Sequence, residues 1–161
     1  MCERETDDPD SLVGRLYDRY GASLYRYAVM LLADNTAAED AVQQVFAALL
    51  KPGAAVLRNE LHYLRRAVRN ECYSMSRARR TGPVLTRPLL EPRSSDGSPE
   101  ERLALAAAMV HLTPEQREVV HLHAFEGLTF QEVADATSES INTIASRYRY
   151  ALARLREVLS A

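Results

Sequence analysis

The C-terminal third of the chain reads L-T-P-E-Q-R-E-V-V (112–120), then L-T-F-Q-E-V-A (128–134), then I-N-T-I-A-S-R-Y-R-Y-A-L-A-R-L-R (141–156). In the first stretch Thr113 precedes Pro114, and a hydroxyl cap followed by proline is a typical helix start. In the second, Thr129 stands three residues before Glu132, the spacing of a capping box. The stretch therefore predicts helices in close succession, the last of them long and basic.

The breaks between these helices are short. The first helix is expected to end at Gly127, and a polar turn over 136–139 is expected before the last helix begins at Ser140 or Asn142. Two short helices and a tight turn before a longer basic helix are typical of a helix-turn-helix, whose last helix enters the DNA major groove.

Placing the last helix's residues at about 100° each separates two faces. Its predicted apolar stripe consists of Ile141, Ile144, Tyr148, Leu152, Leu155 and Leu159. Small hydrogen-bonding residues with arginines at their edges point the other way, which suits base-edge contacts between phosphate contacts. The alternative is a merely solvated face of a helical bundle. The candidate DNA-contacting residues are Asn142, Thr143, Ser146, Arg147, Arg149 and Tyr150.

The rest of the sequence predicts an all-α protein made of two small helical domains. Apolar residues recur at helical spacing, with no alternating run. Residues 1–10 are expected to be an acidic flexible tail, 11–80 a first helical domain, 81–99 a linker rich in proline and serine, and 100–161 the helix-turn-helix domain.

Bulk properties exclude several classes of protein. The 161 residues carry a formal net charge of −2, so the chain is not a basic nucleic-acid coat. Cys2 and Cys72 make no disulfide framework, and no apolar run is long enough to span a membrane, so a cytoplasmic protein is expected. We predict no enzyme, metal or cofactor, because no nucleophile–base set or phosphate loop is visible, and His121 and His123 diverge on a helix.

The helix expected over 37–50 carries an unusual pair of apolar residues. Phe46 and Leu50 lie beside its polar face, where Glu39, Asp40 and Gln43 point. One explanation is that the loop after Pro52 folds back over them. The other is a protein-binding face with an aromatic anchor among acidic and amide groups.

The helix expected over 59–80 has arginines and aromatic residues on the face opposite its apolar stripe. Arginines can hold a nucleic-acid backbone while rings stack on bases, so this face suits single-stranded nucleic acid. A charged, solvated face is the alternative. The candidate residues are Tyr63, Arg66, Arg69, Asn70, Tyr73, Arg77 and Arg80.

Three stretches together resemble the extracytoplasmic-function (ECF) group of bacterial RNA polymerase sigma-70 factors. They are L-L-A-D-N-T-A-A-E-D-A-V-Q-Q-V-F (31–46), Y-L-R-R-A-V-R-N-E-C-Y-S-M-S-R-A-R-R (63–80) and the C-terminal stretch quoted above. Their order and the intervening linker match that group's two-domain plan, which holds the family's second and fourth conserved regions. Ser138 departs from the pattern, because glycine is common there.

The resemblance implies a sigma factor that directs promoter recognition, promoter melting and transcription initiation. Core RNA polymerase would bind Glu39, Asp40, Gln43, Gln44, Phe46 and Leu50, the 59–80 helix would engage the melted minus-10 element, and the last helix would read the minus-35 duplex. An anti-sigma factor is a further expected partner. The alternative is a stand-alone helix-turn-helix regulator that never binds polymerase.

Overall fold

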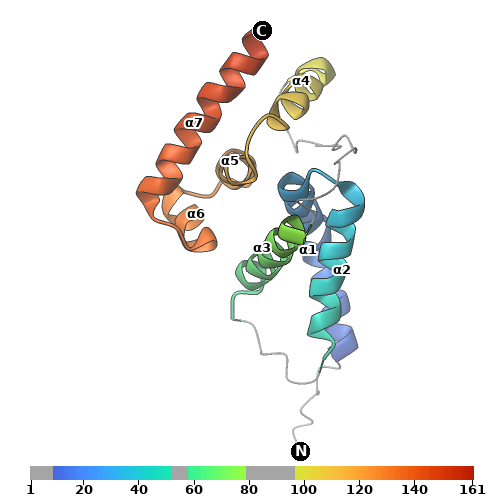
Figure 1. Cartoon of the computed structure of the whole chain (residues 1–161). Coiled ribbons are helices and arrows are strands. Elements are labelled where there is room, and N and C mark those ends of the chain that lie inside the picture. Colours follow the sequence, from blue (N-terminus) through green and yellow to red (C-terminus); the bar gives the residue numbers. More distant parts are fainter. Residues whose placement is uncertain (1–8, 52–57, 79–96) are drawn as a thin grey trace, which may run out of the picture.

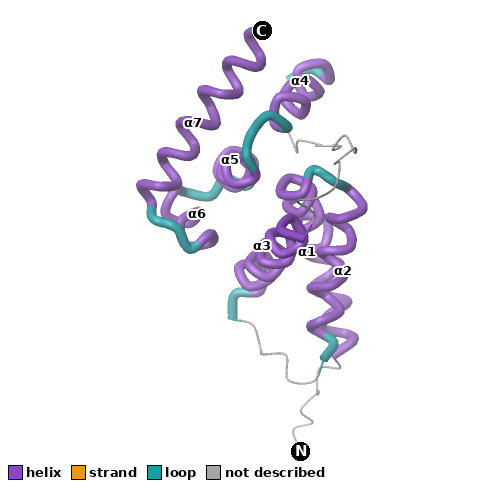
Figure 2. Tube along the Cα trace, viewed as in Figure 1, coloured by secondary structure: helices purple, strands orange, loops and turns teal. Residues whose placement is uncertain are grey.

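The computed structural model describes residues 9–51, 58–78 and 97–161 of the chain. In these ranges every regular element is a helix, and Figure 2 shows helices and loops but no strand among them. The all-α prediction is thus confirmed. Most of the expected acidic tail, the loop after Pro52 and most of the expected linker lie outside the described residues.

The N-terminal module consists of three long helices, α1 (Pro9–Leu32), α2 (Asn35–Leu49) and α3 (Glu60–Ala78), which pack against one another (Figure 1). Asp34 caps α2, because its Oδ1 accepts a hydrogen bond of 3.0 Å from the backbone N–H of Ala37. All five residues that repeat at helical spacing on α2 are buried, namely Ala38, Ala41, Val42, Val45 and Leu49.

The C-terminal module begins with α4 (Pro99–Met109) and α5 (Pro114–Val120), each opened by a capping box and a proline in its first turn. The backbone continues from α5 into a π-helical turn, η1 (His121–Phe125), and then reverses near Gly127, whose φ is 75°. The predicted cap at Thr113 is confirmed, since its side chain accepts from the N–H of Gln116.

The helix-turn-helix follows as α6 (Phe130–Thr137) and α7 (Ile141–Ser160). The predicted capping box is present, because the Thr129 hydroxyl accepts from the N–H of Glu132 while Glu132 accepts from the N–H of Thr129. The turn is shorter than predicted, since α6 extends to Thr137. Ser138 then adopts a left-handed conformation, and Ser140 caps α7.

The apolar stripe predicted for α7 is correct in its middle and wrong at its ends. Ile144 and Leu155 are buried, together with Ala151, whereas Ile141 is 45% exposed and Leu159 is 51% exposed. These two positions lie in the first and last turns, and Figure 1 shows the C-terminal end of α7 projecting beyond the other helices. No helix in the described ranges is therefore packed over Leu159.

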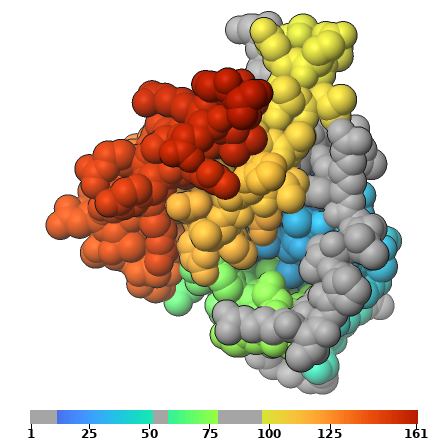
Figure 3. Space-filling model, turned by 45° about the horizontal axis from the view of Figure 1, so that its top comes forward, coloured from blue at the N-terminus to red at the C-terminus, as the bar shows by residue number. Residues whose placement is uncertain are grey.

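The two modules share their hydrophobic core. Leu122 of η1 and Ile144 of α7 belong to the same buried cluster as Leu24 and Leu64 of the N-terminal module. Met30 of α1 belongs instead to a second cluster, built mainly from α4, α5 and α7. Figure 3 accordingly shows the yellow-to-orange segment packed directly on green atoms of α3. The modules are thus held together by apolar packing in addition to the covalent linker.

Candidate nucleic-acid interface

The outward face of α7 is positioned by the tight turn after α6. Asn142, Arg149 and Tyr150 are exposed, with Tyr150 at 62%, while Thr143 and Ser146 are half-buried. The guanidinium of Arg149 lies over the Tyr150 ring, 5.5 Å from its centroid. The structure therefore brings these predicted residues together on one accessible helix face.

Arg147 on the same helix already has an ionic partner. Its Nη2 lies 3.0 Å from Oε1 of Glu139, in the turn before α7, and both side chains are partly exposed. Surface pairs of this kind contribute about 0–1 kcal/mol, so a phosphate could replace Glu139. The pair meanwhile holds the guanidinium near the start of the helix.

The predicted face of α3 is divided by the structure into two parts. Tyr63 is 45% exposed, and Arg66, Asn70 and Arg77 are exposed as well. Positions 66, 70 and 77 fall on one stripe of the helix, so their side chains lie along one line. Arg80 lies outside the described residues.

The other part of the α3 face is covered by Glu118 of α5. Arg69 donates from Nε to Glu118 Oε1 at 2.7 Å and from Nη2 to Oε2 at 3.3 Å, and the Tyr73 hydroxyl donates to Oε2 at 2.9 Å. The hydroxyl of Tyr27 on α1 also donates to Oε1. Glu118 has no exposed surface. The expectation that Arg69 and Tyr73 point into solvent is therefore wrong, because the second module covers them.

The network shifts the ionisation of its members. Burial, followed by the charge of Glu118, raises the pKa of Tyr27 and of Tyr73, so both remain hydroxyl donors. Burial alone would lower the pKa of Arg69, but its hydrogen bonds and charge pairing with Glu118 outweigh this and raise it. A buried carboxylate with a bidentate arginine and two hydroxyl donors has its hydrogen-bonding capacity satisfied.

Two further polar contacts join the modules beside Glu118. Arg117 Nη2 donates to the backbone carbonyl of Leu31 at 3.2 Å, so the arginine satisfies a carbonyl in the last turn of α1. Arg65 of α3 lies 3.8 Å from Glu126, and His121 Nε2 lies 3.3 Å from the same carboxylate. The close contact with His121, followed by nearby arginine charge, outweighs burial and lowers the pKa of Glu126.

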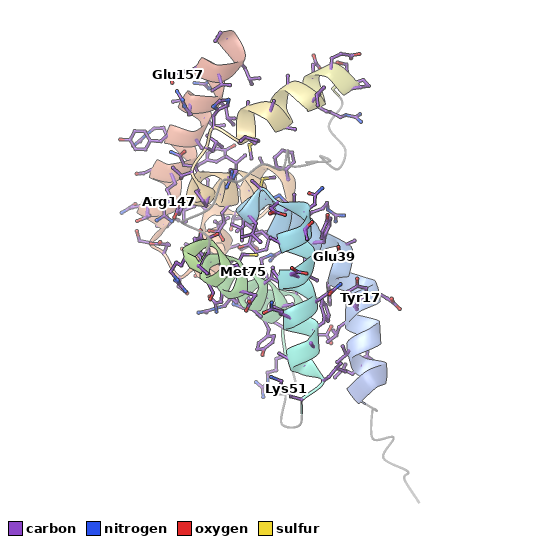
Figure 4. All side chains as sticks on the ribbon, turned by 45° about the vertical axis from the view of Figure 1, so that its right-hand side comes forward. Tyr17, Glu39, Lys51, Met75, Arg147 and Glu157 are labelled. Atoms are coloured by element: carbon purple, nitrogen blue, oxygen red, sulfur yellow. The ribbon has the colours of Figure 1, made fainter. Side chains whose placement is uncertain are left out.

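The candidate partner-binding face of α2 is exposed along its polar residues. Glu39, Asp40, Gln43 and Gln44 are all exposed, and the Gln43 side chain donates to Glu39 at 3.4 Å. Figure 4 shows Glu39 and Tyr17 on the α1–α2 side of the molecule and Arg147 on the opposite side. The two candidate surfaces therefore face in different directions.

Phe46 requires a correction. Only 5% of it is exposed, because α1 covers it and Tyr17 contacts its ring edge-on at a centroid distance of 5.1 Å. The expectation that Phe46 is an accessible aromatic anchor is therefore wrong, while the loop after Pro52, the other expected cover, lies outside the described residues. Leu50 is 47% exposed and Tyr17 is 51% exposed, so these two are the large accessible apolar side chains beside the α2 face.

The sequence reasoning missed the roles of Glu118, Tyr27 and Tyr17. Glu118 precedes Val119 and Val120, and an acid beside a buried apolar run is the signal that could have marked it. Tyr17 gave no such signal, because its spacing on α1 does not separate it from other exposed residues of that helix.

The histidines pack in separate environments. His121 stacks with Tyr27, while His123 contacts Phe130 and Tyr148 and its Nδ1 lies 2.7 Å from the carbonyl of Leu128. Among the described residues, no group of three or more potential ligands is arranged to hold a metal ion. No described helix combines the length and apolar character needed to cross a membrane.

Comparison with known proteins identifies both modules. Residues 16–81 match the family "Sigma-70 region 2", and residues 108–157 match "Sigma-70, region 4". The chain is 36% identical to the RNA polymerase sigma-E factor of Streptomyces antibioticus, across 85% of this chain and 78% of that one. It is 30% identical to the ECF RNA polymerase sigma factor SigK of Mycolicibacterium vanbaalenii, across 89% of this chain and 79% of that one.

Solved structures agree with this assignment. The fold resembles Bartonella quintana RpoE, solved in complex with the anti-sigma factor NepR, with a TM-score of 0.72, 26% identity and coverage of 92% of this chain and 96% of that one. CnrH, solved with the cytosolic domain of CnrY, shares the fold at 22% identity, with a TM-score of 0.63 and coverage of 94% and 89%. The chain belongs to the ECF group of RNA polymerase sigma factors in the sigma-70 family.

Proposed function

We propose that this sigma factor uses three separate helix faces, one for each step of initiation. The α1–α2 face binds core RNA polymerase, the α3 face holds the melted minus-10 strand, and the α7 face reads the minus-35 duplex. The observation that carries this proposal is that the acidic and amide face of α2 and the arginine-bearing face of α7 lie on different sides of one molecule (Figure 4). Because its DNA and polymerase partners are intracellular, the protein acts in the cytoplasm.

The polymerase-binding face is the polar surface of α2 with its apolar edges. Asp40, Gln43 and Gln44 supply exposed carboxylate and amide groups, and Leu50 and Tyr17 supply apolar area beside them. Interfaces of this kind depend on a few apolar or aromatic anchors surrounded by a polar rim. In this arrangement Tyr17 is the accessible aromatic residue and the buried Phe46 supports its ring from below.

The minus-10 and minus-35 faces differ in the form of DNA that they suit. The Tyr63 ring is accessible for base stacking, Asn70 can hydrogen-bond a base edge, and Arg66 can hold a phosphate, all of which fits single-stranded DNA. On α7, Asn142 and Ser146 are flanked by Arg149, which fits base-edge readout in a major groove with phosphate contacts at its sides.

Two further points concern partners. A stand-alone helix-turn-helix regulator would account for the C-terminal module alone, whereas the family matches cover both modules. An anti-sigma factor is proposed as an additional partner, because Bartonella quintana RpoE was solved bound to the anti-sigma factor NepR.

Run-off transcription with purified core polymerase tests the proposal. The unmodified chain should give discrete start sites on genomic DNA fragments. Asp40→Ala and Tyr17→Ala should weaken holoenzyme assembly, measured by size-exclusion titration, by about 2 kcal/mol for an anchor residue. Glu157→Ala, which removes an exposed carboxylate at the far end of α7, is the matched control and should assemble normally. Start-site mapping that shows no dependence on the added chain would refute the proposed function.

A further inference from the structure

The contact between α3 and α5 involves residues that the proposed function assigns to DNA. We infer that Glu118 is an intramolecular latch, which holds the two modules closed and keeps part of the minus-10 face covered in the free protein. This inference rests on the proposed function, since self-inhibition has meaning only if the α3 face binds DNA. Three observations support it: which module supplies the hydrogen-bond donors around Glu118, how Arg69 covers the Tyr73 ring, and which polar groups water can solvate on opening.

The donors around Glu118 all come from the other module. Tyr27 belongs to α1, and Arg69 and Tyr73 belong to α3, whereas Glu118 belongs to α5. Each carboxylate oxygen accepts two hydrogen bonds, one of them from the arginine. Such a network forms only when the modules are in contact, so its free energy contributes to closure and not to the folding of either module alone.

The latch uses the same groups that DNA would use. The Arg69 guanidinium lies over the Tyr73 ring, 4.6 Å from its centroid, and is bonded to Glu118 at the same time. The arginine therefore cannot hold a phosphate, and it covers the ring face on which a base would stack. Closure and binding of the melted strand at these two residues are mutually exclusive.

The contact is also suited to opening. Once the modules separate, water can solvate Glu118, Arg69 and the tyrosine hydroxyls, so opening leaves none of these polar groups without a partner. Opening also exposes apolar side chains that the modules share, such as Leu64 and Leu122, so this packing and the Glu118 network together hold the closed arrangement. Arg66 and Asn70 remain exposed in the closed arrangement. A DNA strand could therefore contact the open half of the face first and replace Glu118 at the covered half afterwards.

Two variants of the full chain separate closure from folding. Glu118→Gln preserves size but removes the charge, and its amide NH₂ meets a site lined by donors. Tyr73→Phe removes one hydroxyl and keeps the ring for stacking. Glu157→Gln neutralises an exposed carboxylate and is the matched control. Small-angle X-ray scattering reports module separation, circular dichroism reports folding, and fluorescence anisotropy reports binding to a labelled single-stranded DNA of random sequence.

Removing one partner of a buried charge pair typically shifts an equilibrium by about 100-fold or more, so Glu118→Gln should raise the radius of gyration. Its affinity for the single-stranded probe should rise by the factor by which the open fraction rises, about tenfold or more if the parent is mainly closed. Tyr73→Phe should change both quantities in the same direction and by less. Helix content should be unchanged in all three variants.

The outcomes are distinguishable. An unchanged radius of gyration in a folded Glu118→Gln variant would overturn the latch. Separation of the modules with no gain in single-stranded DNA affinity would overturn self-inhibition. Adding Arg66→Ala to the open variant tests the DNA face itself: a loss of probe affinity supports the α3 assignment, whereas unchanged affinity would refute the proposed function of α3 and leave the structural latch intact.

Discussion

Helices α3 and α7 carry similar sets of side chains, but the structure places them in different situations. On α7 the residues opposite the apolar stripe are exposed or half-buried, and the ion pairs of this helix, Arg147 with Glu139 and Arg154 with Glu157, are local and partly exposed. On α3 the equivalent face is divided, because Arg69 and Tyr73 are engaged by Glu118 of the other module. The proposed minus-35 face on α7 is thus accessible, whereas part of the proposed minus-10 face on α3 is covered.

The difference shows that a residue on the side of a helix away from its own module's core is not always exposed to solvent. Periodicity identifies the side that does not pack within a module, but a second module can cover that side. Arginine and tyrosine side chains can donate hydrogen bonds to a carboxylate or to a phosphate, so the residue types on α3 fit both a contact between modules and a contact with DNA. The predictions below test whether the two helices differ as described.

The largest effect should come from removing the cation on α3. Arg69→Ala leaves the Glu118 carboxylate in the contact with no positive partner, which typically costs about 3–5 kcal/mol for a buried pair. Arg66→Ala, three residues earlier and exposed, should change stability by less than about 0.5 kcal/mol. Urea denaturation of both variants measures the difference. Equal midpoints would show that the Arg69–Glu118 pair contributes nothing to stability.

The buried side of α3 offers a second test through Cys72. Burial, followed by the nearby acids Glu71 and Glu118, raises the pKa of its thiol from 9.0 to about 12. The thiolate fraction at pH 8 should therefore be about 1000-fold lower than for an unperturbed thiol, and reaction with a disulfide reagent correspondingly slow. A Cys2→Ser background isolates this signal, and unfolding in urea should restore fast reaction. Rapid labelling of the native variant would contradict the packing of α3.

The same shift has a pH consequence. The pKa of the Cys72 thiol is higher in the folded than in the unfolded protein. Its contribution to the free energy of unfolding is therefore fully present below the unfolded pKa, and it is lost as pH rises from about 9 toward 12. The free energy of unfolding of the parent should therefore fall in this range. Cys72→Ala should show a smaller fall, and an identical pH profile would contradict the assignment.

Local rules predicted the start of most C-terminal elements. The caps at Thr113 and Thr129 were predictable because each satisfies N–H groups within three residues, using information contained in a few adjacent positions. The π-helical turn after Val120 was not predictable, because no side-chain cap marks its start. The exposed ends of the α7 stripe depend on where neighbouring helices stop.

The candidate sites were less predictable than the fold for a related reason. Glu118 contacts Arg69 and Tyr73, which belong to the other module and are distant in the sequence. A contact of this kind leaves no pattern in the local sequence from which it could be predicted. Phe46 was assigned to the wrong environment because Tyr17 covers it from another helix. On α7 helical spacing alone predicted the exposure of Asn142, Arg149 and Tyr150, because no helix in the described part of the chain covers them.

A smaller effect is expected in the turn that orients α7. Ser138 has a φ of 57°, a left-handed conformation that costs a residue with a Cβ about 1–2 kcal/mol, part of which glycine recovers. Ser138→Gly should therefore raise the free energy of unfolding by about 0.5–1 kcal/mol, and Ser138→Ala should not. Thermal denaturation compares the three proteins. A destabilised glycine variant would show that the serine side chain has a role of its own in the turn.

The claim that α3 handles the melted strand and α7 the duplex is tested most directly by permanganate footprinting of unpaired thymines in the holoenzyme–promoter complex. Asn70→Ala should lower the open-complex yield on a matched promoter and regain it when the minus-10 region is already mismatched, because the unpairing cost is then largely removed. Arg149→Ala should lower the yield equally on both templates, because it weakens duplex binding. If Asn70→Ala melts the matched promoter as well as the parent does, or if the mismatch rescues Arg149→Ala, the division of labour is wrong.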